Sequence, residues 1–145
     1  MPQDPDVPAI SVLLIDSSKK QRKYWADQLR SCSSDYEILE AEDGQSALNL
    51  YRSRRIDCVV LEISLPDQEG FKTLVELVPV VSRPKIAVIV LTVMTHPGVW
   101  RLAKESGAHV CLAKEFTSGE HLDRAIQRAV AFVGSLPKED PYRPN

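Results

Sequence analysis

Short runs of consecutive apolar residues recur along the chain, separated by stretches in which apolar residues return every three or four positions. Such unbroken runs are typical of strands that are buried on both faces of a parallel sheet. The segment YEILEA alternates instead, which indicates a strand at the edge of the sheet. The strands that this pattern predicts are residues 10–15, 36–41, 58–61, 86–91 and 109–113.

The stretches between the apolar runs have the spacing of amphipathic helices, and the last stretch is the clearest. There Leu122, Ile126 and Ala129 share one face, and Thr117 with Glu120 has the spacing of a capping box. A helix thus follows each strand, which predicts an α/β fold with a single doubly wound (βα)5 domain and a parallel five-stranded sheet. The other helices are predicted at residues 19–31, 45–53, 71–78 and about 99–106.

Proline positions mark the ends of the folded body. Most of the 10 prolines lie near the two termini, where they disfavour regular structure. We expect one domain over residues 9–134, with loose proline-rich ends at residues 1–8 and 135–145. A chain of 145 residues is long enough for one hydrophobic core and too short for two.

Charge and cysteine content narrow the classes of function. The chain has 18 basic and 20 acidic side chains, so its net charge of -2 favours neither nucleic acid nor an anionic membrane as a partner. The three cysteines fit no metal-ligand spacing, which favours free thiols in a reducing cytoplasm. No apolar run reaches the roughly 18 residues of a membrane span. We therefore expect a cytoplasmic protein whose partner is a small molecule or another protein.

Four polar residues stand at the ends of separate predicted strands, namely Asp16, Glu62, Thr92 and Lys114. The carboxyl ends of parallel strands meet at one edge of the sheet, where doubly wound proteins bind their ligands. Two acids and a base at that edge predict an electrostatic site. The alternative treats the residues separately, as a helix cap, a solvated carboxylate, a strand former and a surface charge. Their shared edge favours the first interpretation.

The motifs around these residues resemble, in order and spacing, the four motif blocks of bacterial response-regulator receiver domains. These domains belong to two-component and phosphorelay signal transduction. The blocks are LLIDSS, VVLEISLPDQEG, VIVLT and CLAKEF, and the resemblance covers residues 11–133. The resemblance implies a flavodoxin-like, CheY-like fold with strand order 2-1-3-4-5. It also implies phosphoryl transfer from a histidine kinase to an aspartate that ends the third strand.

The resemblance can be carried over residue by residue. Glu62 occupies the phosphoacceptor position, Thr92 the switch hydroxyl and Lys114 the position that contacts the phosphoryl group. Asp16 matches the first of the family's two acids after the first strand. Ser17 completes this acidic pocket, and it stands where the family places the carboxylate that touches Mg²⁺.

Further positions bear on metal binding and on switching. The backbone carbonyl of Ser64 matches the one that completes the family's metal shell, so Asp16, Glu62 and this carbonyl remain as metal ligands. Cys111 replaces an aromatic switch residue, and Glu115 replaces a proline. The second acid is missing and the nucleophile is one methylene too long. We therefore expect weak or no Mg²⁺ binding, no other cofactor and at most residual self-phosphotransfer.

Three functions remain open at this point. The first is an atypical receiver, or pseudo-receiver, that is not an enzyme and acts through protein contacts without phosphorylation. In it, Glu62 either imitates a phosphoryl group or only pairs with Lys114. The second is a conventional Mg²⁺-dependent receiver, phosphorylated at Glu62 or at a neighbour such as Asp67. The third is a flavodoxin-like cofactor-binding or hydrolytic domain, which the glycine-free turn DSSKKQR disfavours.

The resemblance also implies protein partners, either a histidine kinase or an output protein or domain. The segment SLPKEDPYRPN is too short and proline-rich to fold alone, so we expect no DNA-binding segment there and output through a partner or a longer parent chain. The resemblance marks the face of the fourth helix, fifth strand and fifth helix as a surface for targets or a homodimer. Trp100 and His121 lie in its helices. We expect Trp100 to be core rather than interface, although Pro97 and Gly98 favour a partly exposed helix.

Overall fold

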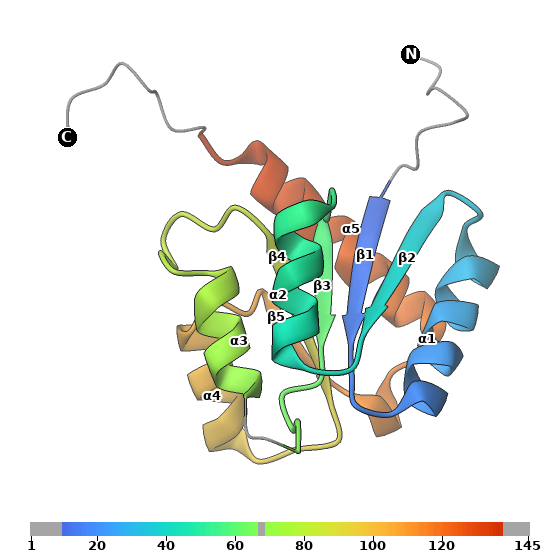
Figure 1. Ribbon diagram of the computed structural model, residues 1–145, viewed down its shortest axis with the longest axis horizontal. Coiled ribbons are helices and arrows are strands. Elements are labelled where there is room, and N and C mark those ends of the chain that lie inside the picture. The colour runs from blue at the N-terminus through green and yellow to red at the C-terminus, as the bar shows by residue number, and fades with distance from the viewer. Residues whose placement is uncertain (1–9, 67–68, 138–145) are drawn as a thin grey trace.

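The computed structural model describes residues 10–66 and 69–137, which form one parallel sheet between two layers of helices (Figure 1). The strands are β1 Ile10–Ile15, β2 Tyr36–Ala41, β3 Cys58–Leu61, β4 Ala87–Thr92 and β5 Val110–Ala113. Within the described residues they lie in the order β2-β1-β3-β4-β5 and all pair in parallel, so the predicted flavodoxin-like order is confirmed. The first three strands have the predicted bounds, and the last two begin one residue later than predicted.

The helices lie within about two residues of their predicted bounds. They are α1 Lys19–Cys32, α2 Gly44–Ser53, α3 Gly70–Leu77, α4 Pro97–Glu105 and α5 Gly119–Ser135, with a short 3₁₀ helix, η1, at Lys114–Phe116. The start of α4 is earlier than predicted because Pro97 occupies its first turn, where no intrahelical N–H is needed. His96 caps this turn, since its Nδ1 accepts a hydrogen bond from the N–H of Gly98 at 3.0 Å.

The predicted capping box of Thr117 and Glu120 is wrong. Ser118 is the N-cap of α5, and its hydroxyl oxygen accepts a hydrogen bond from the N–H of His121 at 3.0 Å. The Thr117 hydroxyl instead donates to the carbonyl oxygen of Ala113 at 2.7 Å. The short η1 turn brings the end of β5 within reach of Thr117, so the next residue along becomes the cap.

The ends of the chain lie mostly outside the described residues. The helix α5 ends at Ser135, one residue beyond the predicted boundary of the folded body. Residues 1–9 and 138–145, which hold most of the predicted loose ends, lie outside the described residues, as does Asp67. In the described ranges, none of the helices combines the length and the apolar character that crossing a bilayer requires.

Each face of the sheet carries its own hydrophobic core, which explains the unbroken apolar runs of the strands. Leu13 and Leu14 are neighbours in β1 but point to opposite faces, since side chains alternate along a strand. One face is covered by α2, α3 and α4 and the other by α1 and α5 (Figure 1). The helices contribute Ala47, Leu74, Leu77 and Ala103 to the first core, and Trp25, Leu29, Leu122 and Ile126 to the second. Among the strands that the structure describes, β2 pairs with β1 alone, so the predicted edge strand is confirmed.

The start of α3 lies directly against the chain that leaves β3. A Cβ atom on Gly70 would lie 2.0 Å from the carbonyl oxygen of Ile63, which is a backbone atom with no rotamer to move into. Glycine is required here by the close approach of two backbone segments. Ile63 follows Glu62 immediately, so this contact holds the backbone that carries the predicted phosphoacceptor position.

Tyr36, at the start of β2, is joined to α5 through its hydroxyl. The hydroxyl donates to Oδ1 of Asp123 at 2.5 Å and accepts a hydrogen bond from Nε2 of Gln127 at 3.4 Å. Burial, and then the carboxylate of Asp123, raise the pKa of Tyr36 well above its ordinary value of about 10. The folded state therefore favours the protonated hydroxyl.

We expect the free energy of unfolding to fall as the pH rises above about 10, because the unfolded tyrosine ionises there while the folded one stays protonated. Tyr36→Phe should lower this free energy by about 1 kcal/mol near neutral pH and make the alkaline fall shallower. Cys58 and Cys111 leave a remaining slope, because burial also raises their pKa values. Urea unfolding near neutral pH and at about pH 10.5 measures both effects, and equal alkaline slopes would contradict the assignment.

Candidate functional site

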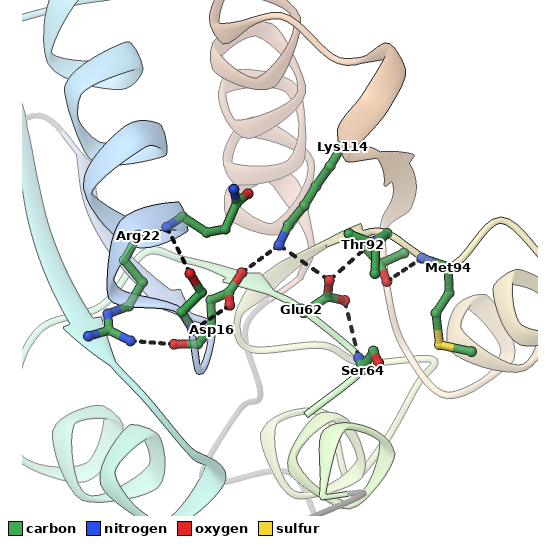
Figure 2. Close-up of polar contacts among 10 residues, drawn as sticks. Asp16, Arg22, Glu62, Ser64, Thr92, Met94 and Lys114 are labelled. Atoms are coloured by element: carbon green, nitrogen blue, oxygen red, sulfur yellow. Dashed lines mark hydrogen bonds and ion pairs between the residues drawn. The ribbon is translucent and has the colours of Figure 1, made fainter. Parts of the chain in front are cut away.

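The four strand-end residues singled out in the sequence lie at one edge of the sheet (Figure 2). Asp16 follows β1, Glu62 follows β3, Thr92 ends β4 and Lys114 follows β5. The four strands are consecutive in the sheet, so their carboxyl ends meet, although Asp16 and Lys114 are 98 residues apart in sequence. The structure therefore brings the predicted site residues together from distant parts of the chain.

Lys114 joins the two acids. Its Nζ lies 2.5 Å from Oδ2 of Asp16 and 3.3 Å from Oε1 of Glu62. The side chains of Lys114, Asp16 and Glu62 are 10%, 12% and 5% exposed, respectively. We call these three residues the acid–lysine cluster. Charges with so little access to water depend on one another, because a lost partner cannot be replaced by full hydration.

Backbone N–H groups satisfy the other oxygens of the cluster. Oδ1 of Asp16 accepts a hydrogen bond from the N–H of Ser18 at 2.8 Å. Oε2 of Glu62 accepts one from Ser64 at 3.1 Å, and its Oε1 accepts one from Val93 at 3.1 Å. Two carboxylates face a single ammonium group, and these N–H donors offset the remaining negative charge. Each carboxylate oxygen of the cluster thus has a partner.

The hydroxyl of Thr92 holds the segment that leaves β4. Its Oγ1 accepts a hydrogen bond from the N–H of Met94 at 3.0 Å. Val93 lies between these two residues and donates its N–H to Glu62. Successive N–H groups of the loop after β4 are therefore bound by the two predicted site residues Glu62 and Thr92 (Figure 2).

Arg22 on α1 also belongs to the site, although no sequence motif indicates it. Its guanidinium donates to the carbonyl oxygen of Asp16 at 2.5 Å (Figure 2). It also donates to the carboxylate of Glu40 at 3.0 Å. Arg22 also lines a cavity of about 10 Å³ beside the cluster, which has room for about one water molecule. The only local signal is its position one turn after the cap Ser18, from which a long side chain reaches back past the helix start.

The sequence of this chain is similar to a known family of signalling domains. The model of the response regulator receiver domain matches residues 12–127. The chain belongs to this family. The receiver is 32% identical over 120 residues to Protein CcdB of Bacillus subtilis, across 82% of this chain and 96% of that protein. It is 30% identical over 121 residues to the transcriptional regulatory protein PdtaR of Mycobacterium tuberculosis, across 83% of this chain and 56% of that protein.

Solved structures agree with the family match. The chemotaxis protein CheY4 of Vibrio cholerae is 27% identical to the receiver, with a TM-score of 0.72 over 83% of this chain and 98% of that one. A Francisella response-regulator receiver domain has a TM-score of 0.73 at 21% identity, over 85% of this chain and 98% of that one, and supports the fold alone. The chain is thus a receiver domain of two-component signalling. Such domains are signalling modules that interact with kinases and output domains.

The residues of this receiver do not fit the Mg²⁺ ion that the family implies. Ser17 offers an exposed hydroxyl in place of a carboxylate, and both Asp16 and Glu62 already direct an oxygen to Lys114. Among the residues that the structure describes, no group of three or more His, Cys, Asp or Glu is arranged to hold a metal ion. Mg²⁺ requires near-octahedral oxygen ligands, so two engaged carboxylates and the Ser64 carbonyl make a poor shell.

The two other departures from the family motifs have different surroundings. Glu115 is exposed in η1 and leaves Lys114 in the cluster. Cys111 lies on β5, and its thiol donates to the carbonyl oxygen of Trp100 at 3.7 Å. Burial raises the pKa of Cys111 to about 11, so the thiol stays protonated at neutral pH. Trp100 is half-buried against the core under α4 and donates its indole N–H to the carbonyl oxygen of Met94 at 2.7 Å.

Proposed function

We propose that this receiver works without phosphorylation, as a pseudo-receiver, and transmits its signal through protein contacts in the cytoplasm. The acid–lysine cluster is the observation that carries the proposal. Lys114 bridges Asp16 and Glu62, and both oxygens of Glu62 already have partners. Each of these bonds lowers the nucleophilicity of the carboxylate, and the alignment of an oxygen with phosphorus must compete with them.

The charge balance of the site supports the same proposal. Phosphoryl transfer builds negative charge on the transferred group, which family members neutralise with Mg²⁺ and a lysine. In this receiver the lysine already serves two carboxylates, and Ser17 replaces the acid that contacts the metal. The extra methylene of Glu62 moves the nucleophilic oxygen by about an ångström, which is enough to slow transfer by orders of magnitude.

We further propose that the cluster is a fixed scaffold and only a partial imitation of a phosphoryl group. Glu62 supplies one negative charge, whereas a phosphoryl group supplies up to about two. That single charge is already shared between Lys114 and the N–H groups of Ser64 and Val93. A cofactor-binding role for the cluster has little support, because the cavity of about 10 Å³ beside it is far smaller than a cofactor.

The face formed by α4, β5 and α5 is our proposed surface for a kinase, an output protein or a second copy of the chain. Leu102 on α4 is 49% exposed and Phe116 in η1 is 77% exposed, and His121 on α5 is also exposed. These side chains are accessible to a partner in the part of the chain that the structure describes. Light scattering over a range of concentrations distinguishes a second copy from a different partner.

The proposed function predicts that acetyl phosphate with Mg²⁺ leaves the wild-type protein without a stably attached phosphoryl group. The double variant Ser17→Asp with Glu62→Asp restores both carboxylates at the family's length, so it should gain one phosphoryl group. We also expect Mg²⁺ to bind the double variant at least about tenfold more tightly than the wild type. Intact mass spectrometry measures the first effect, and a titration followed by Trp25 fluorescence measures the second.

The matched control is the double variant Ser17→Asn with Glu62→Asn, which places neutral side chains of the same shape as aspartate at the same positions. It should stay unmodified and bind Mg²⁺ no better than the wild type. A stable phosphoryl group on the wild-type protein would refute the proposed function. A folded Ser17→Asp, Glu62→Asp protein that stays unmodified would refute the assignment of the defect to these two residues.

A further inference from the structure

Side chains from three elements hold the loop between β4 and α4 by its backbone. Glu62 accepts a hydrogen bond from the N–H of Val93 at 3.1 Å, and Thr92 accepts one from the N–H of Met94 at 3.0 Å (Figure 2). Trp100, on α4, donates its indole N–H to the carbonyl oxygen of Met94 at 2.7 Å. The peptide groups on both sides of Met94 are therefore bound, one by the site and the other by α4.

Trp100 is itself held in place. Its ring is half-buried and packs against the core that α2, α3 and α4 cover. The thiol of Cys111 donates to its carbonyl oxygen at 3.7 Å, and the raised pKa of that thiol keeps the proton in place at neutral pH. Ala103, one turn further along α4, is fully buried. The indole N–H of Trp100 is thus held in one position.

The bond between Trp100 and Met94 has a simpler explanation, since a half-buried indole usually finds some acceptor. Two observations argue that it does more. Val93 and Met94 are apolar yet 66% and 37% exposed, so hydrophobic burial does not hold the loop in this conformation. Trp25 is only 4% exposed, and its Nε1 has no protein hydrogen-bond partner within the described residues, so a buried indole in this fold need not bind a loop backbone.

We propose that Trp100 is a positioning residue that couples α4 to the acid–lysine cluster through the backbone of Met94. Glu62 and Thr92 bind the N–H groups of Val93 and Met94, and Trp100 binds the carbonyl oxygen of Met94, so the conformation of these two residues is set jointly. A partner that binds α4 therefore meets a surface whose position Glu62 and Thr92 help to fix. This inference rests on the proposed action through protein contacts, and it assigns the link between site and surface to a residue on α4.

Amide hydrogen exchange followed by NMR tests the coupling from the α4 side. Trp100→Phe keeps the aromatic ring but removes the donor to Met94. It should speed exchange of the Val93 and Met94 amides by about two- to tenfold, the range that corresponds to one hydrogen bond, and leave β1 unchanged. Trp25→Phe is the matched control, since the same atoms are removed from an indole that makes no hydrogen bond to the loop. It should leave the loop rates unchanged.

The reciprocal experiment starts from the site. Thr92→Val keeps the branched shape but removes the acceptor for Met94, so it should speed exchange of the Trp100 indole proton by about two- to tenfold. Thr92→Ser keeps the hydroxyl and should restore the wild-type rate. In Thr92→Val combined with Trp100→Phe, the loop amides should exchange little faster than in either single variant, because either change already releases the loop.

The coupling is overturned if Thr92→Val leaves the Trp100 indole proton unchanged, or if Trp100→Phe and Trp25→Phe have equal effects on the loop. Additive effects in the combined variant would also overturn it, because they would show two independent contacts. None of these measurements uses a phosphoryl donor. Phosphorylation of the wild-type protein would therefore refute the proposed function while leaving the coupling intact, and the two failures can be told apart.

Discussion

Lys114→Met should lower the free energy of unfolding at neutral pH by about 3–5 kcal/mol. The substitution keeps an unbranched side chain of similar length but removes the ammonium group between Asp16 and Glu62. Two carboxylates that are 12% and 5% exposed would then face each other without their shared cation. Urea denaturation measures the loss, and the slope of the transition should stay close to that of the wild type because the same surface is exposed on unfolding.

Two further variants identify the cause of that loss. Lys23→Met makes the same chemical change in a pair with Asp27 whose side chains are 75% and 55% exposed, so it should cost less than about 1 kcal/mol. Adding Glu62→Gln to Lys114→Met removes one of the two unpaired charges and should recover part of the lost stability. If the two changes add instead, Lys114 contributes through packing and not through charge.

Gly70→Ala should destabilise the protein by about 3 kcal/mol or prevent it from folding. The added methyl group would sit 2.0 Å from the carbonyl oxygen of Ile63, and relief of this clash requires α3 to move away from the chain after β3. Because Ile63 is bonded to Glu62, the same movement would disturb the acid–lysine cluster. Thermal and urea unfolding measure the loss, and NMR shifts at Ser64 and Val93 report the disturbance.

Gly134→Ala is the matched control for Gly70→Ala. Gly134 lies in α5, and a Cβ atom there would meet nothing within 4 Å. Alanine is the better helix former, so this variant should be more stable than the wild type by about 0.5–1 kcal/mol. A tolerated Gly70→Ala, with a stability close to that of Gly134→Ala, would show that the two backbone segments can separate without cost.

The inner strands could be predicted closely because helices cover both faces of the sheet, which favours apolar side chains at most positions of those strands. Helix starts were less predictable, since they depend on competition between neighbouring polar groups. Thr117 and Ser118 can both cap a helix, and the choice follows from the hydrogen bond between Thr117 and the carbonyl oxygen of Ala113. That carbonyl is brought into reach by a turn that no local pattern indicates.

Site residues at strand ends could be predicted from the sequence, whereas those that bind backbone carbonyls could not. Asp16, Glu62 and Lys114 could be placed together because each stands at a strand end and the topology joins those ends. Arg22 and Trp100 could not be placed, because they bind the backbone carbonyl oxygens of Asp16 and Met94. Every residue has such a carbonyl, so the residue types around these acceptors do not indicate that the contact exists.

The low exposure of the acid–lysine cluster also determines how the receiver responds to ionic strength. Dissolved ions weaken the attraction between charges in water beyond a Debye length of about 8 Å at 0.15 M, and of about 3 Å at 1 M. The exposed pair Lys23 and Asp27 should therefore lose most of its attraction in molar salt, whereas Lys114 and Glu62, at 10% and 5% exposed, keep theirs. High salt should thus weaken the surface ion pairs of this receiver and leave the ion pairs at its strand ends almost unchanged.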